Sequence, residues 1–168
     1  MTRAVAASLM GAALALFTVP GQSAAEPIDA TAYAIGKCFS RGDVPQVKPA
    51  RFAYNCDETG VMQDMTWSAW GSDGAHGTGT DNAIECQPNC AEGARLINPI
   101  VVHAWNPQVP TTPGCPPGVE FYADMTIAYP EGAPPWIDPG TTWDTGTDFT
   151  TVDDMPAVHY SGLTPVCS

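Results

Sequence analysis

The chain has 168 residues and carries 18 acidic against 6 basic side chains, a formal net charge of −12 at pH 7. This charge excludes most nucleic-acid binders, because no sizeable basic patch can be assembled to neutralise a phosphate backbone. It disfavours binding to an anionic membrane surface for the same reason. The length and the 44% hydrophobic content suit one globular domain and exclude collagen-like and wholly disordered chains.

The first 25 residues have the features of a secretory signal peptide. Arg3 precedes an uncharged, largely apolar stretch, 4–19, and the small residues 23–25 supply a cleavage site. The apolar stretch is shorter than a spanning helix requires, so an uncleaved anchor is the weaker alternative. We therefore expect a secreted protein whose mature chain, residues 26–168, forms a single β domain with no membrane span.

All six cysteines lie in that mature part, where an oxidising compartment would join them in three disulfides. They are Cys38, Cys56, Cys86, Cys90, Cys115 and Cys167. The sequence does not choose among the many pairings that six cysteines allow. Cys86 and Cys90 could pair only through a tight loop, so we expect each to bond to a different strand. Cys38 with Cys56 and Cys115 with Cys167 are candidate pairs.

A metal site is the alternative use of cysteine. Cys86 and Cys90 lack a second closely spaced pair, and no histidine lies near them at ligand spacing. We therefore expect no zinc site and no cofactor.

Alternation of apolar and other residues predicts β-strands through most of the mature chain. The clearest case is 119–129, which indicates a long strand with one buried face. Shorter strand-like runs bounded by Gly, Pro, Asn or Asp cover 51–56, 65–70, 75–82, 100–105 and 157–163. Residues 57–60 are expected to form a hairpin turn.

No window of helical length in the mature chain keeps a helical period, so the chain is expected to be all-β. The spacing of the strands favours an antiparallel β-sandwich, Ig-like or jelly-roll-like, of about six to eight strands. Its core should bury Trp67 and the strand face that carries Phe121, Met125 and Ile127.

Two segments of the domain have the composition of loops. Residues 106–118 contain five prolines, which exclude a central strand and favour an extended course. Residues 130–156 combine prolines with acidic and aromatic side chains and predict a long excursion with little regular structure. A loop of that length is either functional or disordered.

Four segments carry a family resemblance. They are Tyr54-Asn55-Cys56-Asp57, the W-x-x-W segment 67–70, the Gly/Ala/Thr strand 75–80 and the C-x-P-x-C-A-x-G loop 86–93. Together they resemble a group of small secreted actinobacterial proteins. The resemblance covers about residues 50–105 and, more weakly, the strand from Val119, whereas the tail from Pro130 onward departs from it. It implies export and a disulfide-bonded β domain, and nothing catalytic.

No motif with recognisable catalytic spacing is present. Residues 144–147, Asp-Thr-Gly-Thr, match the core of aspartic proteases, but the flanking sequence does not supply the rest of a lobe, so we interpret them as a polar turn. There is no G-x-S-x-G, and His76, His103 and His159 lie away from any nucleophile motif. We assign no catalytic residue.

The acidic aromatic loop, residues 130–156, is the one place where we expect a binding site. Its carboxylates could hold Ca²⁺, although the regular spacing of a calcium loop is missing. Its aromatic rings could form a platform for sugar, and docking of these rings on the domain is the commoner alternative. The candidate ligand-binding residues are Trp136, Asp138, Trp143, Asp144, Asp148, Asp153 and Asp154.

These features predict a non-catalytic, monomeric binding or structural domain with an extracellular or cell-envelope partner. One alternative is a secreted hydrolase assembled from loop Asp and His residues, which would place His103 or His159 beside a carboxylate in a concave pocket. The other is a Ca²⁺- or glycan-binding module, which would expose Trp136 or Trp143 beside clustered acids.

Overall fold

The computed structural model describes residues 31–86 and 89–167, so the expected signal peptide lies outside the described residues. The described chain forms nine strands and no helix. They are β1 (Ala32–Ile35), β2 (Phe52–Ala53), β3 (Gly60–Gly71), β4 (Gly74–Ile84), β5 (Arg95–Gln108), β6 (Val119–Ala128), β7 (Thr142–Asp144), β8 (Thr147–Val152) and β9 (Met155–Ser161). The described residues contain no helix that could span a membrane.

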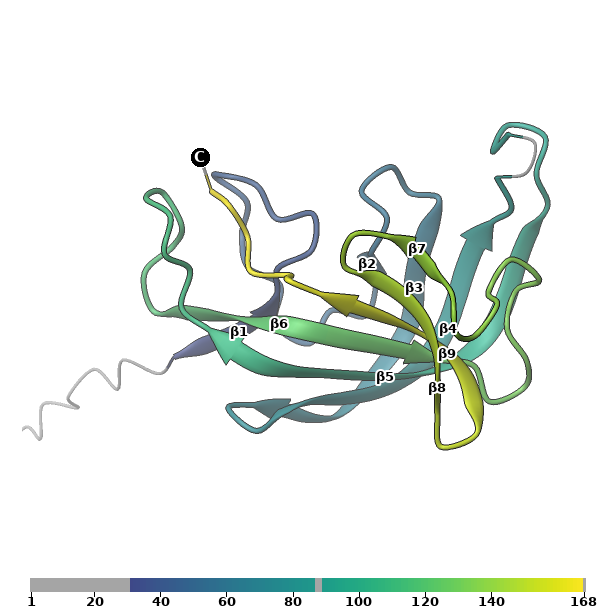
Figure 1. Cartoon of the computed structure of the whole chain (residues 1–168). Coiled ribbons are helices and arrows are strands. Elements are labelled where there is room, and N and C mark those ends of the chain that lie inside the picture. The colour runs from purple at the N-terminus through teal and green to yellow at the C-terminus, as the bar shows by residue number, and fades with distance from the viewer. Residues whose placement is uncertain (1–30, 87–88, 168) are drawn as a thin grey trace, which may run out of the picture.

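All nine strands belong to one sheet, in the order β2-β3-β4-β5-β6-β9-β8-β7, with β1 off this path. Neighbours are antiparallel except β1, which pairs in parallel with the first part of β6, while β9 pairs with the second part. The sheet curls into a half-barrel (Figure 1). The all-β, antiparallel expectation is confirmed in this form. A sandwich of two packed sheets is not confirmed, because a single sheet curls around its own concave face.

The curl has local causes in β3. Its pairing with β4 shifts register between Gln63 and Thr66 and again between Trp67 and Ala69. Such bulges bend a strand and increase its twist. Opposite Trp67, β4 carries Gly77, where a Cβ would lie 2.6 Å from the indole ring. The glycine therefore lets the large ring lie flat on the bent sheet.

The main core lines the concave face. Met125 and Ile127 of β6 are fully buried there, as the sequence predicts, and so is Val102 of β5. Trp67 was expected to be buried but is only partly so, and its indole N–H donates to the carbonyl of Pro49 at 2.9 Å. It still packs against the core.

The expectation of one buried face along 119–129 is wrong. Phe121 is buried, but in a small second cluster with Ala34 and Val119, whereas its neighbour Tyr122 belongs to the main core. Thr126, on the convex side of β6, is also buried, with only 8% of its surface exposed. Side chains pack on both faces of β6, since the ring of Phe39 lies 5.0 Å from the ring of Phe121 while Tyr122 packs in the main core, so alternation alone underestimates its burial.

Several loop boundaries differ from expectation. The segment 106–118 begins inside β5, whose Pro107 pairs opposite Tyr122. Proline is tolerated there because the pairing of β5 with β4 has already ended at Ala104, so the missing N–H costs no ladder bond on that side. The segment 130–156 contains β7 and β8, and the run 51–56 reduces to the short β2.

The three disulfides join Cys38 to Cys56, Cys86 to Cys90 and Cys115 to Cys167. The first and third are the candidate pairs from the sequence. The expectation that Cys86 and Cys90 bond to different strands is wrong, because the two candidate pairs leave them only each other. Three disulfides are consistent with an extracellular or otherwise oxidising environment.

Candidate functional site

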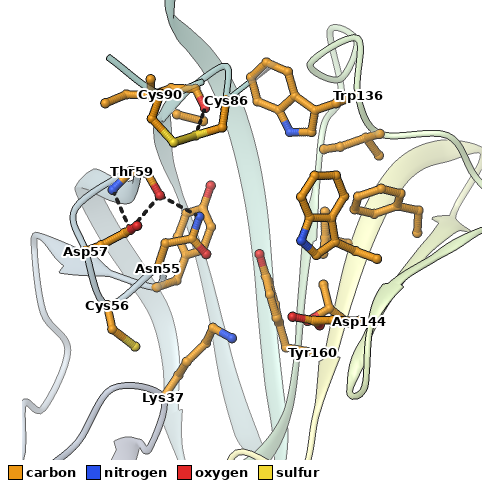
Figure 2. Close-up of a pocket in the computed structure, with 18 of the residues that line it drawn as sticks. Lys37, Asn55, Cys56, Asp57, Thr59, Cys86, Cys90, Trp136, Asp144 and Tyr160 are labelled. Atoms are coloured by element: carbon orange, nitrogen blue, oxygen red, sulfur yellow. Dashed lines mark hydrogen bonds between the residues drawn. A yellow bond between two sulfur atoms is a disulfide. The ribbon is translucent and has the colours of Figure 1, made fainter. Parts of the chain in front are cut away.

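A cleft of about 640 Å³ opens on the concave face of the half-barrel. One wall comes from the β2–β3 turn and the Cys86–Cys90 loop, and the other from the acidic aromatic loop. Figure 2 shows Asn55, Asp57 and Thr59 on one side facing Trp136 and Asp144 across the opening. The cleft therefore lies between segments that are far apart in the sequence.

The first wall is a rigid polar turn. The Asp57 carboxylate accepts hydrogen bonds from the backbone N–H of Thr59, at 3.1 Å, and from its hydroxyl, at 2.6 Å. These bonds lower the pKa of Asp57, and the Thr59 hydroxyl also accepts a bond from the Asn55 amide at 3.2 Å. Short side-chain bonds of this kind hold a turn in one conformation.

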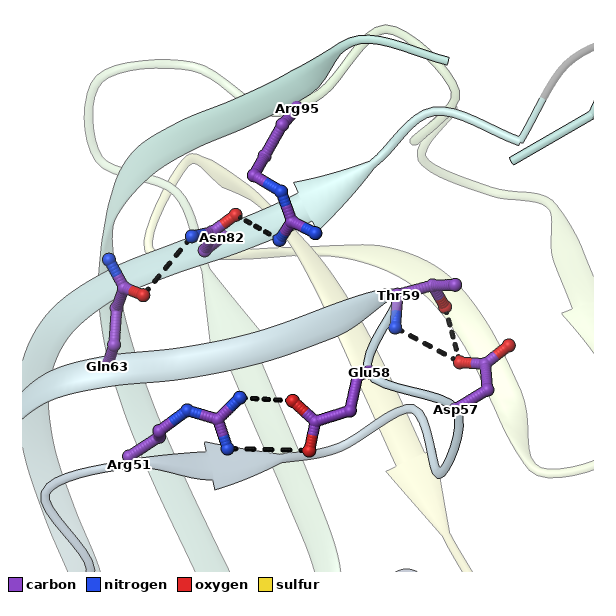
Figure 3. Close-up of polar contacts among 7 residues, drawn as sticks. All are labelled: Arg51, Asp57, Glu58, Thr59, Gln63, Asn82 and Arg95. Atoms are coloured by element: carbon purple, nitrogen blue, oxygen red, sulfur yellow. Dashed lines mark hydrogen bonds and ion pairs between the residues drawn. The ribbon is translucent and has the colours of Figure 1, made fainter. Parts of the chain in front are cut away.

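Polar contacts behind the turn add to its support (Figure 3). Arg51 forms an ion pair with Glu58 beside the turn. On the neighbouring strands, Arg95 donates to Asn82 at 2.7 Å, and Asn82 donates to Gln63 at 3.2 Å. The ion pair is exposed and contributes little energy, but it ties the turn to the residue before β2, and the hydrogen bonds link β3, β4 and β5.

The second wall is aromatic. Trp136 is partly buried and packs against the core, while Trp143 on β7 is 55% exposed and lies 6.0 Å from the ring of Phe149. Asp144, next to Trp143, also lines the cleft. This wall combines apolar ring surface with one carboxylate.

The floor contains a buried carboxylate held by two phenols. Asp81 is fully buried and accepts hydrogen bonds from the hydroxyls of Tyr54, at 2.8 Å, and Tyr129, at 2.9 Å. Burial raises the pKa of Asp81, and it raises the pKa of both tyrosines well above the ordinary value. The two phenols therefore stay protonated, and both tyrosines line the cleft.

One cation lines the cleft. The Lys37 ammonium lies 4.4 Å from the centre of the Tyr160 ring, within the range of a cation–π interaction. Burial lowers the pKa of Lys37, and the negative charge of Asp144 counteracts part of that shift. The charge of Lys37 is thus already partly matched by protein groups.

The structure brings together three of the seven candidate ligand-binding residues, Trp136, Trp143 and Asp144. The other four are elsewhere. Asp148 accepts a bond from Thr142, Asp138 is exposed with its backbone carbonyl bonded to Thr141, and Asp153 and Asp154 form the β8–β9 turn with positive φ.

The acids of the loop are therefore spread along it by its local structure. In residues 31–86 and 89–167, no three His, Cys, Asp or Glu side chains are grouped to hold a metal ion. The run 144–147 is the β7–β8 turn, with Asp144 paired to Thr147, in agreement with its interpretation as a polar turn.

The hydrolase alternative required a histidine beside a carboxylate in a concave pocket. His159 does lie 3.1 Å from Asp124, but both residues are on the convex side of the sheet and neither lines the cleft. His103 is on the same convex side, paired across from His76. The histidines are thus separated from the cleft by the sheet itself.

Sequence reasoning did not identify the floor or the first wall of the cleft. Tyr54 and Tyr160 lay on predicted strands, and Asp57 and Thr59 in a predicted turn, but nothing in their spacing showed that the sheet would curl them toward the aromatic loop. Alternation, which places Val158 and Tyr160 on one face, was the only available signal.

Comparisons of the chain with protein-family models, curated proteins and solved structures found no match. The resemblance to small secreted actinobacterial proteins therefore stays a prediction.

Proposed function

We propose that this protein is a secreted, non-catalytic binding domain that holds a sugar unit of a glycan in the concave cleft. The observation that carries the proposal is the pairing of an aromatic wall, Trp136 and Trp143, with a polar turn on the opposite side. Sugar rings present an apolar face that packs on aromatic rings, and a rim of hydroxyls that needs fixed donors and acceptors.

The polar groups around the cleft fit this ligand class. The Asn55 amide, the Thr59 hydroxyl and the carboxylates of Asp57 and Asp144 are donors and acceptors of the kinds that hydroxyl groups need. The volume, about 640 Å³, is within the range of small-molecule sites. An anionic ligand is disfavoured, because two carboxylates and one lysine line the cleft in a protein of net charge −12.

The described structure favours a glycan over Ca²⁺, because no three acids of the loop are grouped to hold a metal ion. It also gives a hydrolase no histidine in the cleft, because His159, which lies beside Asp124, is on the convex side.

The test is intrinsic tryptophan fluorescence during titration with neutral and amino-sugar oligosaccharides, such as xylohexaose, cellohexaose and chitohexaose. We expect at least one of them to change the emission, and Trp143→Ala to weaken its binding by about fivefold or more, since stacking on an aromatic ring contributes roughly 1 kcal/mol. Trp143 is half exposed, so the variant should fold.

The matched control is Trp105→Phe on the convex side, which should bind as the wild type does. Equal binding by Trp143→Ala and the wild type would overturn the cleft as the site. Binding of the apolar dye 1-anilinonaphthalene-8-sulfonate without binding of any oligosaccharide would overturn the glycan assignment.

A further inference from the structure

All three histidines of the chain lie on the convex side of the sheet, away from the cleft. His76 of β4 is the direct cross-strand partner of His103 of β5. The two rings lie face to face, with centroids 4.1 Å apart and planes inclined by only 10°. His103 also stacks on Trp105, at 4.8 Å, and Trp105 stacks on His159 at 5.4 Å.

The pair differs from the third histidine in its partners. His159 is engaged by the Asp124 carboxylate at 3.1 Å. Among the side-chain hydrogen bonds of the described residues, none involves the imidazole of His76 or of His103. Both rings therefore have nitrogens that are free to bind something outside the protein.

We propose that His76 and His103 together form a binding site for a late first-row divalent metal ion, with Cu²⁺ or Zn²⁺ as the best-suited ions. Imidazole nitrogen is a preferred ligand of these ions, and directly opposed cross-strand side chains are close enough to share one. The site is independent of the proposed glycan cleft, from which the sheet separates it.

The separation of the two imidazole rings suits such an ion. Two nitrogens that each lie about 2.0 to 2.1 Å from a tetrahedral ion are roughly 3.3 Å apart. Ring centroids 4.1 Å apart place the two imidazoles near that separation. In the stacked arrangement the in-plane lone pairs run side by side, so one ring must rotate about its broad χ2 torsion to make them converge.

The surroundings decide which ring rotates. His103 is partly buried between His76 and Trp105, so its ring is held in place, whereas His76 is exposed on its outer side. One ligand is therefore fixed and the other can adjust. Burial and the nearby His76 lower the pKa of His103, which favours the neutral imidazole that a metal requires.

The site would be open. No third His, Cys, Asp or Glu is grouped with the pair in residues 31–86 and 89–167, and all six cysteines are in disulfides. Water or an external ligand would complete the coordination shell. Because only two protein ligands hold the ion, we expect weaker binding than at a site with three or four. Hard cations, which prefer oxygen ligands, should not bind there.

The test is calorimetric titration of the tag-free full chain with Cu²⁺ and with Zn²⁺ at pH 7.5, in a non-coordinating buffer. We expect about one ion per chain for Cu²⁺, weaker binding of Zn²⁺ in line with the usual affinity order, and no binding of Mg²⁺. His76→Gln and His103→Gln should each weaken Cu²⁺ binding by about tenfold or more. Lowering the pH to 5.5 should weaken it as well, because protons compete for the imidazoles.

The matched control is His159→Gln, which removes the third imidazole of the same face and should leave Cu²⁺ affinity within about twofold of the wild type. Thermal unfolding without metal checks that all three variants are folded. Wild-type affinity in both His76→Gln and His103→Gln would overturn the proposal. So would an equal loss in His159→Gln, or the absence of any binding to the wild type.

Discussion

The two faces of the half-barrel are built by the same strands but differ in the environment of their polar groups. On the concave face, Asp81 is buried and accepts hydrogen bonds from two tyrosine hydroxyls. The same two tyrosines belong to the core and also line the cleft. On the convex face, His76, Thr78 and Asn82 of the same strand remain in contact with water. The curvature of the sheet explains this difference, because the loops of the chain cover only the concave face.

The comparison shows why function is placed differently on the two faces. A cleft needs walls that rise above the sheet, and only the concave side has them, in the β2–β3 turn and the acidic aromatic loop. The convex side offers side chains that stand next to one another in register, such as His76 and His103. The first arrangement suits an organic ligand and the second suits a small ion.

The largest expected difference between the faces comes from adjacent valines in β5. Val102 points into the concave core and is fully buried, whereas Val101 lies on the convex side and is partly exposed. Val102→Ala should lower the free energy of unfolding by roughly 2 to 3 kcal/mol, through the loss of two buried methyl groups and the cavity they leave.

The control, Val101→Ala, makes the same chemical change and should cost about 1 kcal/mol or less. Urea unfolding monitored by fluorescence measures both variants. Equal costs would mean that the convex face is covered in solution, and the division of the sheet into a core face and an open face would be wrong.

A second prediction concerns the buried carboxylate. Because burial raises the pKa of Asp81, the folded protein holds this proton more tightly than the unfolded chain does. The contribution of Asp81 to stability should therefore be lost as the pH rises through the folded-state pKa, and be fully present below about pH 4, the ordinary value for aspartate.

Asp81→Asn cannot ionise and keeps an oxygen that accepts a hydrogen bond from one tyrosine. As the pH falls from 7.5 toward 4, the wild type should gain stability relative to this variant, as measured by urea unfolding at each pH. An exposed control, Asp138→Asn, should follow the wild type. A difference between wild type and Asp81→Asn that is constant with pH would contradict the burial of an ionisable group at this position.

The sequence predicted the strands well and the sheet poorly, for physical reasons. Alternation along β6 and the turn residues that bound β4 are local signals, so those strands were found with nearly correct bounds. Alternation says nothing about whether the buried face meets a second sheet or its own curled continuation. The bulges at Gln63 and Trp67, which contribute to the curl, leave no signal in the residue types.

The candidate site was predicted in part for the same reason. Trp136, Trp143 and Asp144 stood out because aromatic and acidic residues in a loop are unusual, and they do line the cleft. The other acids of the loop do not lie with them, because Asp153 and Asp154 are turn residues and Asp148 faces the opposite side of the sheet. Composition identifies a segment, whereas the direction of each side chain depends on pairing.

The smallest expected effect tests the convex face through the contact between Asp124 and His159. Asp124 and His159 lie 3.1 Å apart with side chains 19% and 29% exposed. Asp124→Asn keeps the size and a hydrogen-bonding oxygen, and it should lower the free energy of unfolding by less than about 1 kcal/mol at pH 7, since partly exposed pairs contribute little. Urea unfolding measures this cost, with Val101→Ala unfolded in parallel for comparison. A loss of 3 kcal/mol or more, the usual range for breaking a buried pair, would show that this part of the convex face is withdrawn from water. The contrast between the two faces would then hold only at the histidine pair of β4 and β5 and not along the whole sheet.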